Sequence, residues 1–273
     1  FLAKYQHHAL LPSANYYLAR SKAKADSANK SAYYESFIRQ YPHTNFSTRL
    51  LFELGQQSEA QAQYAEAQEY YQRAIDLGLN KKESARTYYW MGEAAASSGN
   101  NPRARSHFLT LADKYPNSDW APKALYARGR LYLSENRYDS STVAFELLKK
   151  RYPNNEMTRR IGTALGESYY QQGRYQEAIE AFKNAMPYLE GNLKSKAVYL
   201  IAESYNYLNK FDQASTYYLQ YINLNEGTDK VRAAQYGLGW VYHKQEIYHW
   251  AAREFGKAAD GNDEMARKAL YYK

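Results

Sequence analysis

A small residue recurs along this chain at nearly constant intervals of 37, 37, 37, 36 and 37 residues. Each one begins the motif small-x-x-(small or Tyr) inside a pattern typical of a helix. The six positions are Gly55, Gly92, Gly129, Gly166, Ala202 and Gly239. A period of this length indicates an array of one repeated unit, because stacked units of this size build solenoids with a long inner face. The repeat therefore argues against most enzyme folds.

Residues 158–190 show the composition of one unit. Gly173 and Arg174 lie near its middle and are expected to form a turn. The apolar residues at helical spacing are Leu165 and Tyr169 in the first half and Ala178, Phe182 and Ala185 in the second. Each half thus carries one apolar stripe with the period of an α-helix, and the unit is predicted to be two short helices.

The small residues have a packing role in this prediction. Gly166 on the first helix and Ala178 on the second are expected where the two antiparallel helices approach closely, and Phe182 is expected to fill the space beyond them. The same triplet recurs in the other units as Gly55, Ala67 and Tyr71; Gly92, Ala104 and Phe108; Gly129, Ser141 and Phe145; Ala202, Ala214 and Tyr218; and Gly239, Ala251 and Phe255.

The order of these residues resembles the tetratricopeptide repeat, in which an aromatic, Leu-Gly and Tyr are followed by a small residue, an aromatic, Ala and Pro. The unit that follows this order closely contains Tyr88, Met91, Gly92, Ala104, Phe108, Leu111 and Pro116. The resemblance implies an all-α fold, a right-handed α-solenoid of about seven helix-turn-helix units of 36–37 residues.

The unbroken register predicts a single array over residues 1–273. We expect a degenerate repeat at about 11–45 and a truncated repeat at 264–273. The full repeats between them are expected at about 46–82, 83–119, 120–156, 157–192, 193–229 and 230–263. Because Phe1 is not an initiator residue and no secretory leader precedes it, the chain is interpreted as an internal fragment.

Three loops account for the repeats being longer than the usual 34 residues. They begin with Tyr-Pro at residues 41–42, 115–116 and 152–153, and a proline after the last turn stops a helix. The next helix is expected to restart with Ser118 or Asp119 as its cap and Pro122 in its first turn.

The segments around these loops resemble a subclass of bacterial cell-envelope repeat proteins. They read Phe-x-x-Leu-x-x-Lys-Tyr-Pro-Asn-Ser from Phe108 and Phe-x-x-Leu-x-Lys-Arg-Tyr-Pro-Asn-Asn from Phe145. The subclass includes the Tol-Pal-associated proteins and the lipoprotein of the outer-membrane assembly machinery. The resemblance implies the periplasm, or the periplasmic face of the outer membrane, of a Gram-negative bacterium, with the cytoplasm as the alternative.

The charge composition of the chain limits the class of partner that it is expected to bind. The 36 basic and 28 acidic residues give a net charge of +8, but they are spread over every repeat without a dense basic block. This pattern disfavours nucleic acid and suits a protein or peptide partner with acidic side chains, or an anionic envelope surface. No apolar run approaches the ~20 residues that span a bilayer, and the mean hydropathy is -0.80.

The sequence predicts no catalytic, cofactor-binding or metal-binding residues. The histidines, at positions 7, 8, 43, 107, 243 and 249, form no metal-binding pattern, and there are no cysteines. Phosphate-binding loops and nucleophile motifs are also absent from the sequence. We therefore expect neither an enzyme nor a cofactor.

The resemblance implies that the first helix of each unit lines a concave surface on which a partner lies. The register then places a basic row beside an aromatic row and an acidic row. The predicted partner-binding residues are Arg49, Phe52, Arg86, Tyr89, Glu93, Lys123, Tyr126, Arg130, Arg160, Glu167, Tyr170, Lys196, Tyr199, Glu203, Tyr236 and Trp240. Arginines and tyrosines in such rows suit a peptide with carboxylates and apolar side chains.

A structural interpretation of the same residues stays open. Arg160 with Glu167 and Lys196 with Glu203, like Arg86 with Glu93, stand two helical turns apart, so the charges could balance one another and those of nearby repeats. The aromatic rings could equally belong to the packing between helices.

Three functional hypotheses follow. The first is a non-catalytic protein-interaction scaffold in a bacterial cell envelope. The second is a structural spacer or an oligomerisation array, which leaves self-association open. The third is the repeat portion of a larger regulatory or enzymatic protein.

Overall fold

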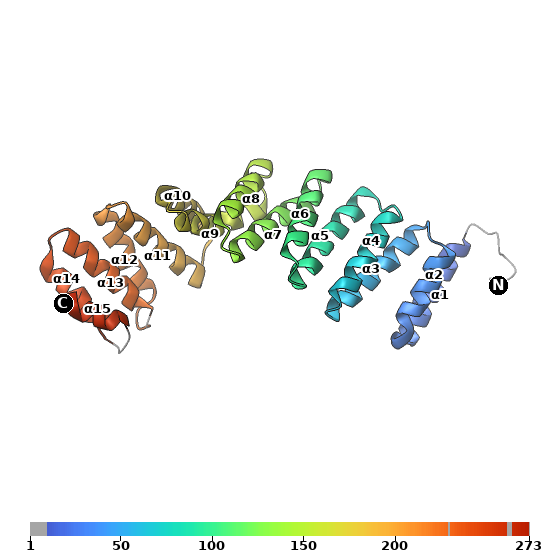
Figure 1. The fold of residues 1–273 in the computed structure, drawn as a ribbon, viewed down its shortest axis with the longest axis horizontal. Coiled ribbons are helices and arrows are strands. Elements are labelled where there is room, and N and C mark those ends of the chain that lie inside the picture. Colours follow the sequence, from blue (N-terminus) through green and yellow to red (C-terminus); the bar gives the residue numbers. More distant parts are fainter. Residues whose placement is uncertain (1–9, 229, 261–263, 273) are drawn as a thin grey trace. The chain divides into compact units, whose positions relative to one another are not determined.

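The computed structural model describes residues 10–228, 230–260 and 264–272, and all regular secondary structure within these ranges is helical. The chain divides into two compact units, residues 1–131 and 132–273. Within each unit, consecutive helices lie side by side as antiparallel hairpins (Figure 1). Apart from the hairpin at the boundary between the units, each first helix packs mainly against the second helix of its own hairpin and also against the neighbouring hairpin.

The first unit contains the helices from α1 to the beginning of α7. Their bounds are α1 Leu11–Ala25, α2 Lys30–Gln40, α3 Asn45–Ala60, α4 Tyr64–Asp76, α5 Lys81–Ser97, α6 Asn101–Lys114 and α7 Trp120–Ser134, with the short 3-10 helix η2 at Ser27–Asn29. Helix α7 crosses the boundary between the two units.

The second unit contains the remaining helices. Their bounds are α8 Tyr138–Arg151, α9 Glu156–Gln171, α10 Tyr175–Ala185, α11 Gly191–Tyr207, α12 Phe211–Leu224, α13 Val231–Lys244, α14 Tyr248–Ala258 and α15 Glu264–Tyr272, with the 3-10 helix η3 at Met186–Tyr188. None of the described helices combines the length and the apolar composition that a membrane span requires.

The recurring small residue makes room for an aromatic ring sixteen residues later in its unit. A Cβ placed on Gly166 would lie 2.7 Å from Cε1 of Phe182, and on Gly92 it would lie 2.4 Å from Cε1 of Phe108. The atoms nearest to each glycine thus belong to the ring, rather than to the alanine that the sequence analysis paired with it. A side chain there would displace a fully buried ring.

The rings also connect neighbouring hairpins. Tyr218 of α12 is fully buried, and a Cβ on Gly237 of α13 would lie 2.6 Å from its Cζ atom. Helix α13 therefore needs a glycine on each of two faces, because Gly239 accommodates the ring of Phe255 in the same hairpin. The sequence analysis did not identify Gly237.

The Tyr-Pro loops end their helices as expected. Tyr41, Tyr115 and Tyr152 each follow the last helical residue, and their N–H groups donate hydrogen bonds of 2.9 Å to the carbonyl oxygens four residues earlier. At the start of α7, Oγ of Ser118 accepts a hydrogen bond of 3.2 Å from the N–H of Trp120. Ser118 is thus the cap of this helix.

Candidate functional site

The sixteen residues predicted to bind a partner lie on the first helices of their hairpins, α3, α5, α7, α9, α11 and α13. We call this set the first-helix face and describe its two portions, residues 49–130 and 160–240, separately. The cations of the set are exposed apart from Arg86, which is half-buried. The acidic and aromatic residues are half-buried, apart from the buried Phe52. The first-helix face therefore combines exposed positive charge with half-buried rings.

Cations of the first portion lie over aromatic rings. The guanidinium carbon of Arg86 on α5 is 4.0 Å from the ring centroid of Phe52 on α3. The ammonium of Lys123 on α7 is 4.6 Å from the ring of Trp120, one turn earlier. Such contacts contribute about 0.5–2 kcal/mol each. They hold these cations in place while leaving Lys123 exposed to solvent.

Tyr89 belongs largely to the packing of the first unit. Its ring centroid is 5.0 Å from that of Trp120 and 5.7 Å from that of Phe108. Burial raises the pKa of Tyr89 above its usual value, and the charge of Glu93 raises it further. Burial likewise raises the pKa of Glu93, although the hydrogen bond from Tyr89 and the charge of Arg130 oppose this change. Only part of the Tyr89 ring remains available to a partner.

Two cations of the second portion form ion pairs with acidic residues. Nη2 of Arg160 lies 2.6 Å from Oε1 of Glu156, one turn earlier on α9, and Nζ of Lys196 on α11 lies 2.7 Å from Oε1 of Glu167 on α9. Lys196 thus pairs with an acidic residue of the neighbouring repeat, as the structural interpretation allowed, whereas Arg160 pairs with a residue of its own helix that the sequence analysis did not name. Spacing along one helix does not reveal that the next hairpin brings Lys196 to Glu167.

Tyrosines surround the carboxylate of Glu203. The hydroxyl of Tyr218 donates a hydrogen bond to it, and Tyr199 provides a second one. Burial raises the pKa of Glu203, and both hydrogen bonds oppose this change. Burial raises the pKa of Tyr170, and the charge of Glu203 raises it further. This carboxylate is thus already satisfied by the fold and offers little to a partner.

The sequence analysis missed two rings beside Tyr170. Tyr207 of α11 and Tyr175 of α10 stack with ring centroids 4.6 Å apart and planes 6° apart, and Tyr207 lies 6.2 Å from Tyr170. Tyr207 is 55% exposed. The available signal was its spacing of four residues from Glu203, which places both on one side of α11.

Aromatic residues of α13 pack beneath the last described helix. The ring of Trp240 is 4.6 Å from that of Tyr272 on α15, and Tyr236 is 5.6 Å from Phe255. Helix α15 therefore contributes a ring to the surroundings of Trp240. The remainder of the Trp240 ring is solvent-accessible, since the residue is half-buried.

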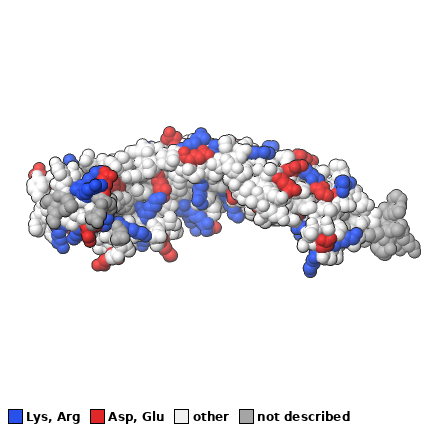
Figure 2. All heavy atoms as spheres, turned by 60° about the horizontal axis from the view of Figure 1, so that its bottom comes forward, with Lys and Arg blue, Asp and Glu red and all other residues white. Residues whose placement is uncertain are grey.

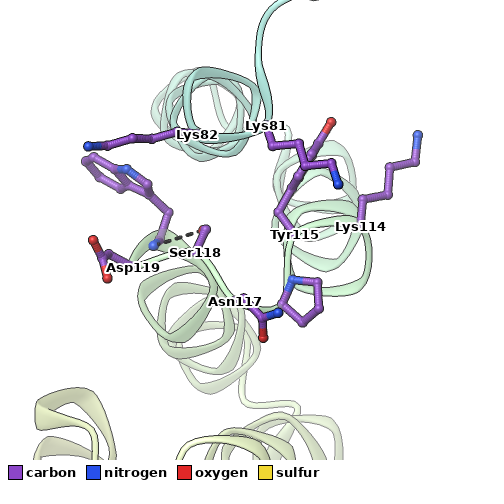
Figure 3. Close-up of a pocket in the computed structure, with 9 residues that line it drawn as sticks. Lys81, Lys82, Lys114, Tyr115, Asn117, Ser118 and Asp119 are labelled. Carbon is purple, nitrogen blue, oxygen red and sulfur yellow. Dashed lines mark hydrogen bonds between the residues drawn. The ribbon is translucent and has the colours of Figure 1, made fainter.

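A pocket of about 460 Å³ lies between α5, the end of α6 and the start of α7. Lys82 and Asp119 lie on one side of its opening, and Tyr115 and Lys114 on the opposite side (Figure 3). The lining residues are Lys81, Lys82, Lys114, Tyr115, Pro116, Asn117, Ser118, Asp119 and Trp120. The sequence analysis assigned a cap and a loop to this segment but did not predict a pocket.

Over the visible face of each unit, Lys and Arg are interspersed with Asp and Glu, and uncharged surface lies between them (Figure 2). This distribution differs from the continuous basic surface of many nucleic-acid-binding proteins. In the described ranges, no three acidic, histidine or cysteine side chains come together as a metal site would require.

Comparison with solved structures supports the fold. A tetratricopeptide repeat protein from Parabacteroides merdae is 20% identical, with a TM-score of 0.52 over 94% of this chain and 98% of that chain. MamA from Desulfovibrio magneticus RS-1 is 16% identical, with a TM-score of 0.54 over 69% of this chain and 98% of that chain. Another MamA structure is 18% identical, with a TM-score of 0.56 over 70% and 96% of the two chains. At these identities the likeness concerns the fold.

Family models provide the sequence-level assignment. A search of curated proteins gave no match. Models described as tetratricopeptide repeats match residues 13–44, 52–119, 123–155, 163–186 and 199–266, which leaves only short gaps in most of the chain. Together with the hairpins and their glycine–aromatic contacts, these matches confirm the expected all-α solenoid class. The chain belongs to the tetratricopeptide repeat family.

Proposed function

We propose that this chain is a non-catalytic scaffold that binds an acidic polypeptide along the first-helix face. Tetratricopeptide repeats bind protein partners, and the matched family models describe no catalytic family. One observation carries the proposal: cations recur at the same position of successive first helices, all of them exposed except the half-buried Arg86, and aromatic rings that are mostly half-buried lie one turn further along most of these helices. Cations attract acidic side chains over a distance, and rigid rings supply contact area.

We further propose a location in the periplasm, or at the periplasmic face of the outer membrane, of a Gram-negative bacterium. The Tyr-Pro-Asn loops after α6 and α8 support this location through their resemblance to envelope repeat proteins. Fractionation of the native cells with an antibody against this chain tests it. Recovery with the cytoplasmic fraction would reject the envelope location and leave the scaffold function untouched.

Affinity capture with the intact protein from its own cells identifies the partner. Binding of that partner is then measured by surface plasmon resonance at two ionic strengths. The variant carries Arg160→Glu and Lys196→Glu, which reverse two exposed cations of the first-helix face. Its matched control carries Lys149→Glu and Lys150→Glu in the last turn of α8, which is a second helix.

We expect the first-helix variant to associate at least ten-fold more slowly than the wild type at low salt and with a flatter salt dependence. The control should associate at a rate close to that of the wild type. Circular dichroism checks that both variants keep their helicity. If the first-helix variant retains full affinity, the partner lies on another surface and the proposal is wrong.

A further inference from the structure

The pocket between α5, α6 and α7 has an excess of positive charge. Lys81 and Lys82 come from the first turn of α5 and Lys114 from the last turn of α6, whereas Asp119 is the only acidic residue in the lining. In the described part of the chain, no carboxylate lies within ion-pair distance of Lys81 or Lys82. The nearby carboxylate of Glu83 already accepts a hydrogen bond of 2.6 Å from Nδ2 of Asn80. The pocket therefore attracts an anionic group from outside the chain.

The pocket also has an aromatic wall that joins it to the first-helix face. Trp120 is half-buried, and its ring lies 5.0 Å from Tyr89 and under the ammonium of Lys123. Tyr89 and Lys123 both belong to the first portion of that face. A chain lying along this portion can thus reach the lysines without leaving the aromatic surface.

The carboxylate of Asp119 and the volume of the pocket limit the class of ligand that the pocket can bind. A carboxylate in the lining repels a densely charged polyanion, but it accepts hydrogen bonds from peptide N–H groups. The volume of about 460 Å³ accommodates a few side chains rather than a folded domain. Lysine ammonium groups bind single carboxylates well because each is a compact charge with three donors.

We propose that this pocket binds an acidic side chain of a polypeptide, with an adjacent apolar side chain of that polypeptide on the indole of Trp120. The inference rests on the proposed function, since it names the chemistry that the partner presents to the first unit. It adds a site at the loop edge whose lining contains none of the residues that were predicted to bind a partner.

The test uses the purified chain and a hexapeptide of alternating glutamate and leucine, blocked at both ends. Calorimetry measures its affinity, and tryptophan fluorescence reports on the pocket. The pocket variant carries Lys81→Gln and Lys82→Gln. The control carries Lys149→Gln and Lys150→Gln, which remove the same charge from the last turn of α8 in the other unit.

We expect the pocket variant to bind the hexapeptide at least ten-fold more weakly than the wild type, and the control to bind within two-fold of it. Trp120→Leu should weaken binding at least five-fold and change the fluorescence response, with helicity checked by circular dichroism. No binding by the wild type, or equal weakening in both lysine variants, would overturn the proposal.

Two further probes identify which chemical group of the ligand the pocket recognises. The same hexapeptide with glutamine in place of glutamate should bind at least ten-fold more weakly, and equal binding would refute the role of the carboxylates. Free glutarate should bind at least ten-fold more weakly than the hexapeptide. If glutarate binds as tightly, the pocket takes a small free anion and the assignment to a polypeptide is wrong.

The outcomes separate this inference from the proposed function. If binding of a captured partner depends on Arg160 and Lys196 but the hexapeptide does not bind, the scaffold function is supported and the proposed pocket site is refuted. If the hexapeptide binds selectively but no partner is captured, the proposed ligand chemistry of the pocket is supported and the scaffold function is refuted.

Discussion

The hydroxyl of Tyr218 on α12 donates a hydrogen bond to the carboxylate of Glu203 on α11. The Tyr218 ring lies against Gly237 of α13, so one side chain connects the two helices of its hairpin with the next hairpin. A similar bond of 3.0 Å joins the hydroxyl of Tyr71 on α4 to Oε2 of Glu59 on α3. These hairpins therefore place a buried tyrosine next to a carboxylate that burial makes more difficult to ionise.

Glu203→Gln should change how stability depends on pH. The folded-state pKa of Glu203 is raised, so between the unfolded pKa of about 4.5 and this raised value the folded chain binds more protons. Its contribution to stability therefore increases as pH falls through that window and decreases as pH rises. Urea unfolding at a series of pH values should show the wild type gaining stability relative to the variant on acidification. Exposed Glu156→Gln is the control, and an opposite trend for Glu203 would contradict the assignment.

His107 should change the pH dependence of stability in the direction opposite to that of Glu203. Burial, with a smaller contribution from Arg103, lowers the pKa of His107 to about 4, and its buried Nε2 has no hydrogen-bond partner. The folded chain consequently binds fewer protons than the unfolded chain between about pH 6.5 and 4, and stability is lost as pH falls. The His107→Gln variant should lose less over the same range in urea titrations, and parallel curves for both proteins would refute this.

Gly166→Ala should destabilise the chain by about 1–3 kcal/mol, because the new methyl group would overlap the ring of Phe182. Adding Phe182→Leu should recover part of this loss, since the smaller side chain makes room for the methyl group. A double-mutant cycle measured by urea unfolding gives the coupling between the two positions. Strict additivity of the two effects would show that the ring does not determine the need for glycine.

Glu246→Gly should stabilise the chain by about 1 kcal/mol. Glu246 has φ 61° in the turn between α13 and α14, a left-handed conformation that strains residues with a Cβ. Gly173 has φ 72° in the corresponding turn between α9 and α10, so Gly173→Ala should lower stability by a similar amount. Thermal unfolding of both variants tests these two expected changes in stability. A loss of stability in Glu246→Gly would be inconsistent with strain in this turn.

Lys196→Ala should lower the free energy of unfolding by less than about 1 kcal/mol, because the ion pair with Glu167 is solvent-exposed. Arg73→Ala should cost more, since Arg73 donates two hydrogen bonds, of 2.7 and 2.9 Å, to the carboxylate of Glu35 and so joins α4 to α2. Chemical unfolding of both variants compares them. A large loss in Lys196→Ala would indicate that this cation serves the fold rather than a partner.

The sequence by itself determined the repeat, its helical class and the small positions, because a period of 36–37 residues and apolar stripes at helical spacing are local properties of the chain. It also located the helix stop at each Tyr-Pro loop and limited the cap of the next helix to Ser118 or Asp119, since caps depend on neighbouring residues, and the structure shows Ser118 in this role. The turn at Gly173 was predicted from its sequence, but the left-handed conformations of Ala62 and Glu246 in the equivalent turns carry no such signal.

Only the tertiary structure decided which side chains meet across hairpins. Lys196 pairs with Glu167, Arg86 lies over Phe52, and Tyr218 packs against Gly237. Each of these contacts joins residues far apart in the chain, and their geometry depends on how one hairpin stacks on the next. The pocket beside Trp120 has the same origin, because its lysines come from the ends of two helices that only packing brings together.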